Sequence, residues 1–298
     1  MEPISVVDGK IFKNVLDESE SGEWKFEPKG GAESVYIPYK NGVYERSLAL
    51  ALFEITANIT QDLKMSSKKF NNKLCIEGID PVSGKLTMFA YIFWNRNSHE
   101  VCIAFKGTKT LSELISDFKF SQVKPKILNG YEEGVLVHKG FYDIYLAIRD
   151  KLWIWWYENQ EWIKTLYITG ISMGGALSTI CSYDFAKVFS CRRNKANNSK
   201  SGKFKIHNLP IHYSFAAPRC GNKDFAKIFK ERLPTSIRVN NTEDIIPQLP
   251  FAQQGPYTYE QTIGNVPFTA SLGSLLLNHT KAYYEYMPHC PEVAPCCF

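Results

Sequence analysis

The sequence predicts a single α/β domain, residues 1–298, in which a mostly parallel central sheet is flanked by helices. Apolar runs of strand length alternate with helix-period patterns along the chain, which is typical of βαβ units. A strand, a tight turn and a helix follow one another within residues 164–177. The sequence shows neither an internal repeat nor a long linker that would divide it.

The composition is that of an ordinary globular chain. Apolar residues make up 44% and charged residues 22%. No apolar run approaches the 18 or so residues that a membrane-spanning helix needs, so we expect no transmembrane segment. The first eight residues lack the basic and apolar regions of a secretory signal, which favours an intracellular location.

The net charge of +5 is concentrated in one segment. Six basic residues and no acidic residue lie between Arg192 and Lys205. We interpret residues 191–203 as a basic surface loop inserted into the domain. The alternative is a patch for anionic lipid head groups. Nucleic acid is not expected as a partner, because no aromatic residues alternate with these charges.

The cysteines predict reduced, buried thiols rather than a disulfide framework, because they are scattered and several lie in apolar runs. None has metal-ligand spacing with another cysteine or a histidine, so no metal is expected. The last three of the eight cysteines lie in the C-terminal tail, residues 286–298. The eight are Cys75, Cys102, Cys181, Cys191, Cys220, Cys290, Cys296 and Cys297.

The first third of the chain supplies a helix and two strands. Residues 1–44 have weak strand signals and are interpreted as an N-terminal extension over the core. Apolar residues recur at helical spacing from Arg46 to about Lys64. The β-branched and aromatic run 85–94 predicts a strand, and the wholly apolar run 101–105 predicts a buried central strand.

Two helices are expected before the tight turn. A short amphipathic helix carries four apolar residues on one side, Leu111, Leu114, Ile115 and Phe118. A longer helix from about 137 to 156 has an apolar stripe made of Phe141, Ile144, Tyr145, Ile148, Leu152, Trp155 and Trp156. Trp153 lies off this stripe, and we expect it to pack under a neighbouring loop, with contact to a membrane interface as the alternative.

The second half continues the alternation. Residues 211–216 form a buried-type strand, and a helix through Phe225 and Phe229 follows. The strand 235–240 then leads to Asp244, and an apolar stretch, 266–277, leads to His279. Polar side chains that follow parallel strands gather at one edge of such a sheet.

Ser172 lies at the centre of the turn, in Gly170-Ile171-Ser172-Met173-Gly174. The pattern Gly-x-Ser-x-Gly between a strand and a helix is a nucleophile elbow. It projects the serine hydroxyl to where a base can take its proton. The sequence therefore predicts Ser172 as a nucleophile.

The base must be a histidine. In α/β-hydrolases the acid and then the histidine follow the serine along the chain. This leaves His207, His212, His279 and His289. The first two flank or lie within a buried strand and are most simply structural. We favour His279, which lies between a loop and a helix, and keep His289 in the tail as the alternative.

The acid that orients this histidine is best sought just after a strand. Asp244 has that position, with Asp224 as the alternative. Asp224 starts a helix, and Asp184 lies on the helix after Ser172, where a surface charge is the simpler interpretation. The oxyanion would bind the N–H of Met173 and a second donor at Thr108, which follows Gly107.

Six motifs in this order resemble the class 3 lipases, the filamentous-fungus triacylglycerol lipases and their relatives, over roughly residues 45–285. They are 105–108 with Asp117, 137–141, 170–177, 217–222, 240–247, and His279 with Tyr283. The sequence departs from the family at Ile171, where histidine is usual, and at Lys106, where arginine is usual.

The resemblance implies an α/β-hydrolase fold and a serine esterase without a cofactor. It assigns Ser172, Asp244 and His279 to a catalytic triad and Thr108 and Met173 to the oxyanion hole. It also implies that the segment around Leu111, Leu114, Ile115 and Phe118 is a lid over an apolar groove.

We therefore expect a hydrolase of acylglycerols that meets its lipid ester at a membrane or lipid-droplet surface. One alternative is a phospholipase A1-type hydrolase, for which the basic segment is the sequence support. The other is a lipase-like scaffold protein without catalysis, against which the intact candidate triad argues.

Overall fold

The computed structural model describes residues 6–7, 10–11, 44–59, 69–108, 120–126, 132–198 and 209–290. The expected lid residues, Leu111, Leu114, Ile115 and Phe118, lie outside the described residues, as do His207 and most of the expected N-terminal extension. Of the C-terminal tail, the structure describes residues 286–290.

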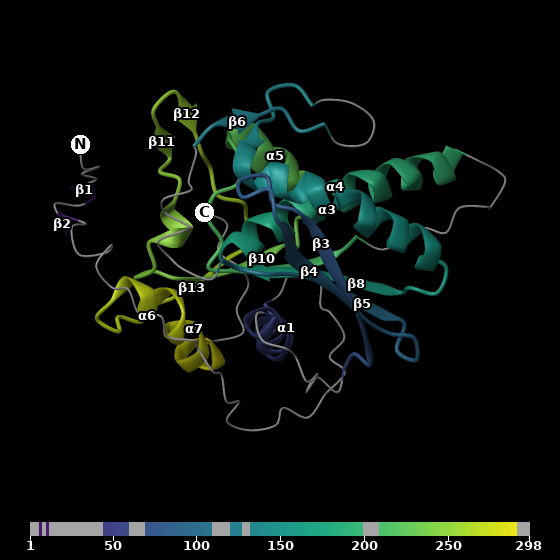
Figure 1. Ribbon diagram of the computed structural model, residues 1–298, viewed down its shortest axis with the longest axis horizontal. Helices are drawn as coiled ribbons and strands as arrows, with labels where there is room; N and C mark the ends of the chain where they lie inside the picture. Colours follow the sequence, from purple (N-terminus) through teal and green to yellow (C-terminus); the bar gives the residue numbers. More distant parts are fainter. Residues whose placement is uncertain are drawn as a thin grey trace.

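A seven-stranded sheet forms the centre of the molecule (Figure 1). Across the sheet the strands are β13 (Asn265–Phe268), β10 (Ile237–Asn241), β9 (Ile211–Phe215), β8 (Thr165–Ile171), β5 (Glu100–Phe105), β4 (Leu86–Asn95) and β3 (Asn72–Ile79). The first five of these strands are parallel, and β4 and β3 extend the sheet in antiparallel fashion from β5.

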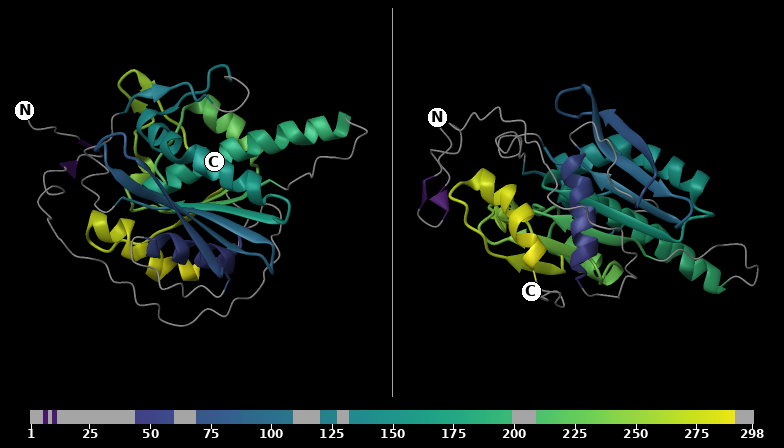
Figure 2. Two further views of the ribbon diagram at one scale, coloured as in Figure 1. Left: turned by 45° about the vertical axis from the view of Figure 1, so that its right-hand side comes forward. Right: turned by 90° about the horizontal axis from the view of Figure 1, so that it is seen from below.

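Helices cover both faces of this sheet (Figures 1 and 2). One face carries α3 (Lys139–Asn159), α4 (Met173–Asn198) and α5 (Lys223–Arg232). The other carries α1 (Arg46–Asn58) and α7 (Lys281–Tyr286). The smaller elements are β1 (Val6–Val7), β2 (Lys10–Ile11), β6 (Gln122–Val123), β7 (Val137–His138), β11 (Gln253–Gln254), β12 (Tyr257–Thr258), α6 (Leu275–His279), η2 (Ile246–Gln248) and η3 (Met287–His289).

Strand β5 shows why the central run of the sequence is wholly apolar. Val101, Ile103 and Phe105 join the hydrophobic core beneath α3 and α4. Cys102 and Ala104 point the other way and join the core beneath α1. Because both faces of the strand are buried, no polar residue alternates with the apolar ones. The predicted mostly parallel sheet between helical layers is confirmed.

Two elements differ from the prediction. Helix α4 continues to Asn198, so the loop predicted for 191–203 is wrong for residues 191–198. Arginine, lysine and alanine are strong helix formers, and they extend the helix away from the sheet. Strand β3 was missed, because its first four residues are all exposed and give no alternation signal.

The described thiols are free, as expected. Cys102, Cys181, Cys220 and Cys290 are buried, whereas Cys75 is exposed. Burial raises the pKa of the Cys220 thiol to about 12, so it stays protonated at neutral pH. No described helix is both long and apolar enough to span a membrane.

Candidate active site

Ser172 lies in a strained turn between β8 and α4. Its φ angle is 57°, a left-handed conformation that is costly for a residue with a side chain. The turn is held by a hydrogen bond from Ser172 N to Phe215 O at 2.9 Å. A Cβ atom at Gly170 would overlap Gly174 O, and one at Gly174 would overlap Phe105 O. The two glycines therefore let the chain fold back tightly, and the turn has the geometry of a nucleophile elbow.

His279 lies against Ser172, although the two are 107 positions apart. Its Nε2 is 2.9 Å from Ser172 Oγ, and its Nδ1 is 2.8 Å from Asp244 Oδ2. Because a carboxylate only accepts, the hydrogen belongs on Nδ1, and Nε2 accepts from the serine hydroxyl. All three side chains are buried, so these bonds form away from bulk water. The structure thus brings together the three residues predicted from sequence.

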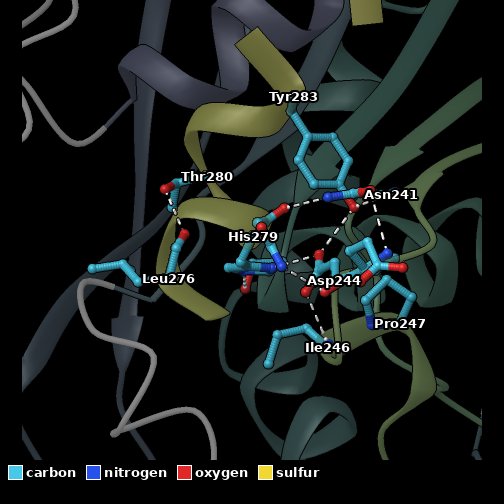
Figure 3. A network of polar contacts seen from close by, with 12 residues as sticks. Asn241, Asp244, Ile246, Pro247, Leu276, His279, Thr280 and Tyr283 are labelled. Atoms are coloured by element: carbon cyan, nitrogen blue, oxygen red, sulfur yellow. Dashed lines mark hydrogen bonds and ion pairs between the residues drawn. The ribbon is translucent and has the colours of Figure 1, made fainter. Parts of the chain in front are cut away.

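Asp244 is held on both of its oxygens just beyond β10. Oδ2 accepts from the Tyr283 hydroxyl at 2.9 Å, in addition to His279, and Oδ1 accepts from Ile246 N at 3.0 Å (Figure 3). These bonds fix the plane of the carboxylate, and therefore the direction in which it holds the imidazole.

Asn241, the last residue of β10, ties the strand that precedes Asp244 to the segment that contains His279. Its backbone N–H donates to the Tyr283 hydroxyl at 3.0 Å (Figure 3). Its side-chain Nδ2 donates to Ala270 O at 2.8 Å and to Asn278 O at 3.0 Å. Asn278 directly precedes His279, so one buried amide sets the spacing between Asp244 and its histidine. Sequence reasoning gave Asn241 and Tyr283 no such role.

The competing candidates lie elsewhere. His289 is exposed in η3, and Asp224 is exposed in the first turn of α5. His212 is buried in β9, where its Nε2 contacts Ser178 Oγ at 3.1 Å and its Nδ1 contacts Ser236 Oγ at 2.7 Å. Burial lowers the pKa of His212 to about 3, so it is a neutral, structural histidine at physiological pH.

Asp184 is not the surface charge that we expected. It is fully buried where α4 packs on α3. Its Oδ2 accepts from Tyr145 Oη at 2.8 Å, from Arg149 Nε at 2.7 Å and from Trp153 Nε1 at 2.9 Å. The three donors are four residues apart on α3 and therefore line one face of that helix. Trp153 is buried by this packing and stacks on Phe185 at a centroid distance of 4.1 Å.

The two expected oxyanion donors belong to segments next to Ser172. Met173 is the first residue of α4, where backbone N–H groups lack partners within the helix. A Cβ atom on Gly107 would lie 3.5 Å from Ser172 Cβ, so the residues around Thr108 run beside the elbow. Within the described residues, no group of three or more His, Cys, Asp or Glu side chains is arranged to hold a metal ion.

Comparison with known sequences gives a family and several relatives. Residues 102–254 match the sequence model of the family Lipase (class 3). Lipase ZK262.3 of Caenorhabditis elegans is 28% identical over 163 residues, which are 54% of this chain and 40% of that protein. The chloroplastic phospholipase A(1) DAD1 of Arabidopsis thaliana is 25% identical over 187 residues, 58% of this chain and 38% of that protein. The chain thus spans less than half the length of these relatives.

The fold matches solved lipase structures. The triacylglyceride lipase of Rhizomucor miehei superposes with a TM-score of 0.53 over 80% of this chain and 89% of that chain. Its sequence is 16% identical, so the likeness shows the shared α/β-hydrolase fold.

Proposed function

Because this chain belongs to the class 3 lipase family, we propose that it is a serine-dependent carboxylic ester hydrolase that acts on acylglycerols. The observation that carries the proposal is the pair of hydrogen bonds made by His279, at 2.9 Å to Ser172 Oγ and at 2.8 Å to Asp244. A buried imidazole between a hydroxyl and a carboxylate has one evident chemical use, which is to take the hydroxyl proton and to bear the resulting charge.

In the acylation step, Ser172 Oγ attacks the ester carbonyl carbon as its proton passes to His279 Nε2. Asp244 stabilises the imidazolium through the bond at Nδ1. The carbonyl oxygen becomes an oxyanion beside the start of α4. There the N–H of Met173 and a donor at Thr108 stabilise it.

The tetrahedral intermediate then collapses. The bond between the acyl carbon and the alcohol oxygen breaks, and His279 returns its proton to the leaving alcohol. Water next attacks the acyl-serine, with His279 again accepting a proton. The carboxylic acid leaves, and the proton returns to Ser172. The cycle needs no redox step and consumes only ester and water.

A phospholipid substrate is the second candidate. The observation that favours it is the similarity to the Arabidopsis protein named phospholipase A(1). Both substrates present a glycerol ester to the same triad, so the triad itself does not distinguish them. A scaffold without catalysis is disfavoured, because it has no use for a strained serine held against a buried histidine.

A substrate panel tests the proposal. The wild-type protein is assayed on p-nitrophenyl butyrate, dioleoylglycerol and phosphatidylcholine, with protein treated with a fluorophosphonate as the matched control. We expect hydrolysis of the first two, faster release of fatty acid from dioleoylglycerol than from phosphatidylcholine, and loss of all activity after treatment. Faster cleavage of phosphatidylcholine would favour the second candidate. Failure to hydrolyse any ester or to react with the fluorophosphonate would refute both.

A further inference from the structure

The turn between β3 and β4 exposes an unusual set of apolar side chains. We call residues 79–86 the hairpin tip. Val82 is 70% exposed and Leu86 62% exposed, which are the highest values for large apolar side chains in the described part of the chain. Ile79 is 58% exposed. Three such side chains within eight residues cost solvation free energy unless something covers them.

The hairpin tip projects from the edge of the sheet that carries Ser172. Ala90 of β4 pairs with Phe105, the residue whose carbonyl lies against the elbow at Gly174. Leu86 precedes Ala90 by four residues on β4, so at strand spacing it lies roughly 13 Å beyond the level of Phe105, the last residue of β5. In the left panel of Figure 2 this turn (dark blue) and α6 (yellow) lie toward the same end of the sheet, and the right panel shows them well separated.

Apolar side chains also border the opposite side of the triad. Helix α6 ends at His279, and the half-buried side chains before it are leucines, namely Leu272, Leu275, Leu276 and Leu277. In the order of the strands, Ser172 at the end of β8 lies between the hairpin tip on the side of β4 and β3 and the leucines before His279 on the side of β10 and β13. A flat apolar phase could contact both borders and present an ester to the site between them.

The hairpin tip is ordered and nearly neutral. It contains one cation, Lys85, and one carboxylate, Asp80. The Asp80 carboxylate accepts from Val82 N and from Ser83 Oγ, both at 2.9 Å. These bonds fix the turn so that the Val82 side chain stays exposed. They also engage the Asp80 carboxylate in hydrogen bonds within the turn. The chemistry of this surface therefore suits apolar contact rather than attraction to charged head groups.

We propose that the hairpin tip docks the enzyme onto the surface of aggregated lipid ester, with Ile79, Val82 and Leu86 entering the apolar phase. The inference rests on the proposed function, since a water-insoluble ester must be reached at its surface. A second copy of the chain fits less well. A second copy would dock by pairing a strand with β3, the outermost strand of the sheet. Strand β3 has a register shift between Ile76 and Glu77 and carries exposed charged side chains, both of which disfavour such pairing.

The experiment compares matched substitutions of exposed apolar residues. The test protein is Ile79→Ser/Val82→Ser/Leu86→Ser. The control is Ile154→Ser on α3, since Ile154 is also 58% exposed but lies near the end of α3, toward the opposite edge of the sheet. Binding is measured by flotation with phosphatidylcholine vesicles containing dioleoylglycerol, and for this measurement each protein also carries Ser172→Ala so that the lipid is not consumed. Activity is measured with proteins that keep Ser172, on those vesicles and on soluble p-nitrophenyl butyrate. Folding is measured by thermal unfolding.

We expect the triple variant to bind vesicles at least about tenfold more weakly and to hydrolyse vesicle lipid correspondingly slowly. Its rate on the soluble ester should stay within about twofold of wild type, and Ile154→Ser should match wild type throughout. Binding should persist in 1 M salt, because no charge pairing drives it. Val82→Trp, which adds an interfacial aromatic side chain to the same turn, should bind more tightly.

Several results would overturn the proposal. Unchanged vesicle binding by the triple variant would do so, as would an equal loss in Ile154→Ser. Conversion of a dimer to a monomer with vesicle binding intact would assign the surface to a second copy instead. If the triple variant unfolds, a Val82→Trp protein that binds no better than wild type would equally refute docking. Failure of the proposed function is distinguishable, because flotation reports binding even when no ester is hydrolysed.

Discussion

The hydroxyl of Tyr283 donates a hydrogen bond to Asp244 Oδ2 at 2.9 Å, the same oxygen that holds His279. Burial and, after it, the neighbouring Asp244 charge raise the pKa of Tyr283 well above its ordinary value, so the phenol keeps its proton. The carboxylate therefore has a permanent neutral donor beside its histidine. We therefore propose that Tyr283 acts through Asp244 as a positioning residue.

Tyr283→Phe should lower kcat by about tenfold with little change in KM, because one hydrogen bond to a charged group is lost and the carboxylate can turn away from His279. The measurement is steady-state kinetics on p-nitrophenyl butyrate across pH 5–9, where the acid limb of the profile should also shift. Tyr286→Phe, one turn nearer the C-terminus and 41% exposed, is the control. Equal kinetics for the two variants would remove Tyr283 from the positioning network.

His279→Ala should reduce turnover of p-nitrophenyl butyrate by roughly four orders of magnitude, since no other described histidine meets Ser172. His289→Ala should leave turnover unchanged, because His289 is exposed in η3. The two substitutions are assayed side by side with thermal unfolding as the folding control. Loss of activity in His289→Ala alone would contradict the assignment of the base.

Asp184→Asn should destabilise the fold by about 3 kcal/mol, because it leaves the Arg149 guanidinium without its buried partner. The turnover of each folded molecule should not change, since Asp184 contacts helix α3 rather than the site. Urea unfolding measures the free energy, and Asp150→Asn, which affects an exposed carboxylate of α3, is the control. A variant as stable as wild type would show that this buried network contributes no stability.

Stability should fall as the pH drops from about 6.5 to about 4. Burial lowers the pKa of His212 to about 3 and that of His138 to about 4. Below about pH 6.5 the unfolded chain therefore binds protons at these histidines that the folded chain does not bind. The stability that these neutral histidines contribute is therefore fully present above the histidine pKa of the unfolded chain, and it is lost as the pH falls below that value. Thermal midpoints of wild type and His212→Gln between pH 7 and 4 test this. The variant should show the shallower decline, and parallel curves would exclude His212 as a cause.

The parts of this site that were predicted from sequence are those with local signals. The strand, glycine and helix around Ser172 lie within a few residues of one another. Asp244 and His279 follow strand-like and apolar runs, which is where the edge of a parallel sheet collects polar groups. The sequence alone did not exclude His289, because only the three-dimensional packing places His279 Nε2 2.9 Å from Ser172.

The parts that were missed depend on contacts between distant segments. Asp184 was interpreted as a surface charge because nothing near it in sequence shows that α3 lies over it. Tyr145, Arg149 and Trp153 do share one helical face, and that row of hydrogen-bond donors beside the apolar stripe was the available signal. Asn241 gave no signal, since its amide partners, Ala270 and Asn278, lie 29 and 37 residues further along the chain.

The role of Ser172 as the nucleophile is tested most directly by the turnover of p-nitrophenyl butyrate by Ser172→Ala beside the wild-type protein. We predict a loss on the order of 10⁴-fold or more, with the thermal unfolding midpoint nearly unchanged, because the reaction loses its nucleophile and the fold loses one hydroxyl. A Ser172→Ala protein that hydrolyses the ester at the wild-type rate would contradict it.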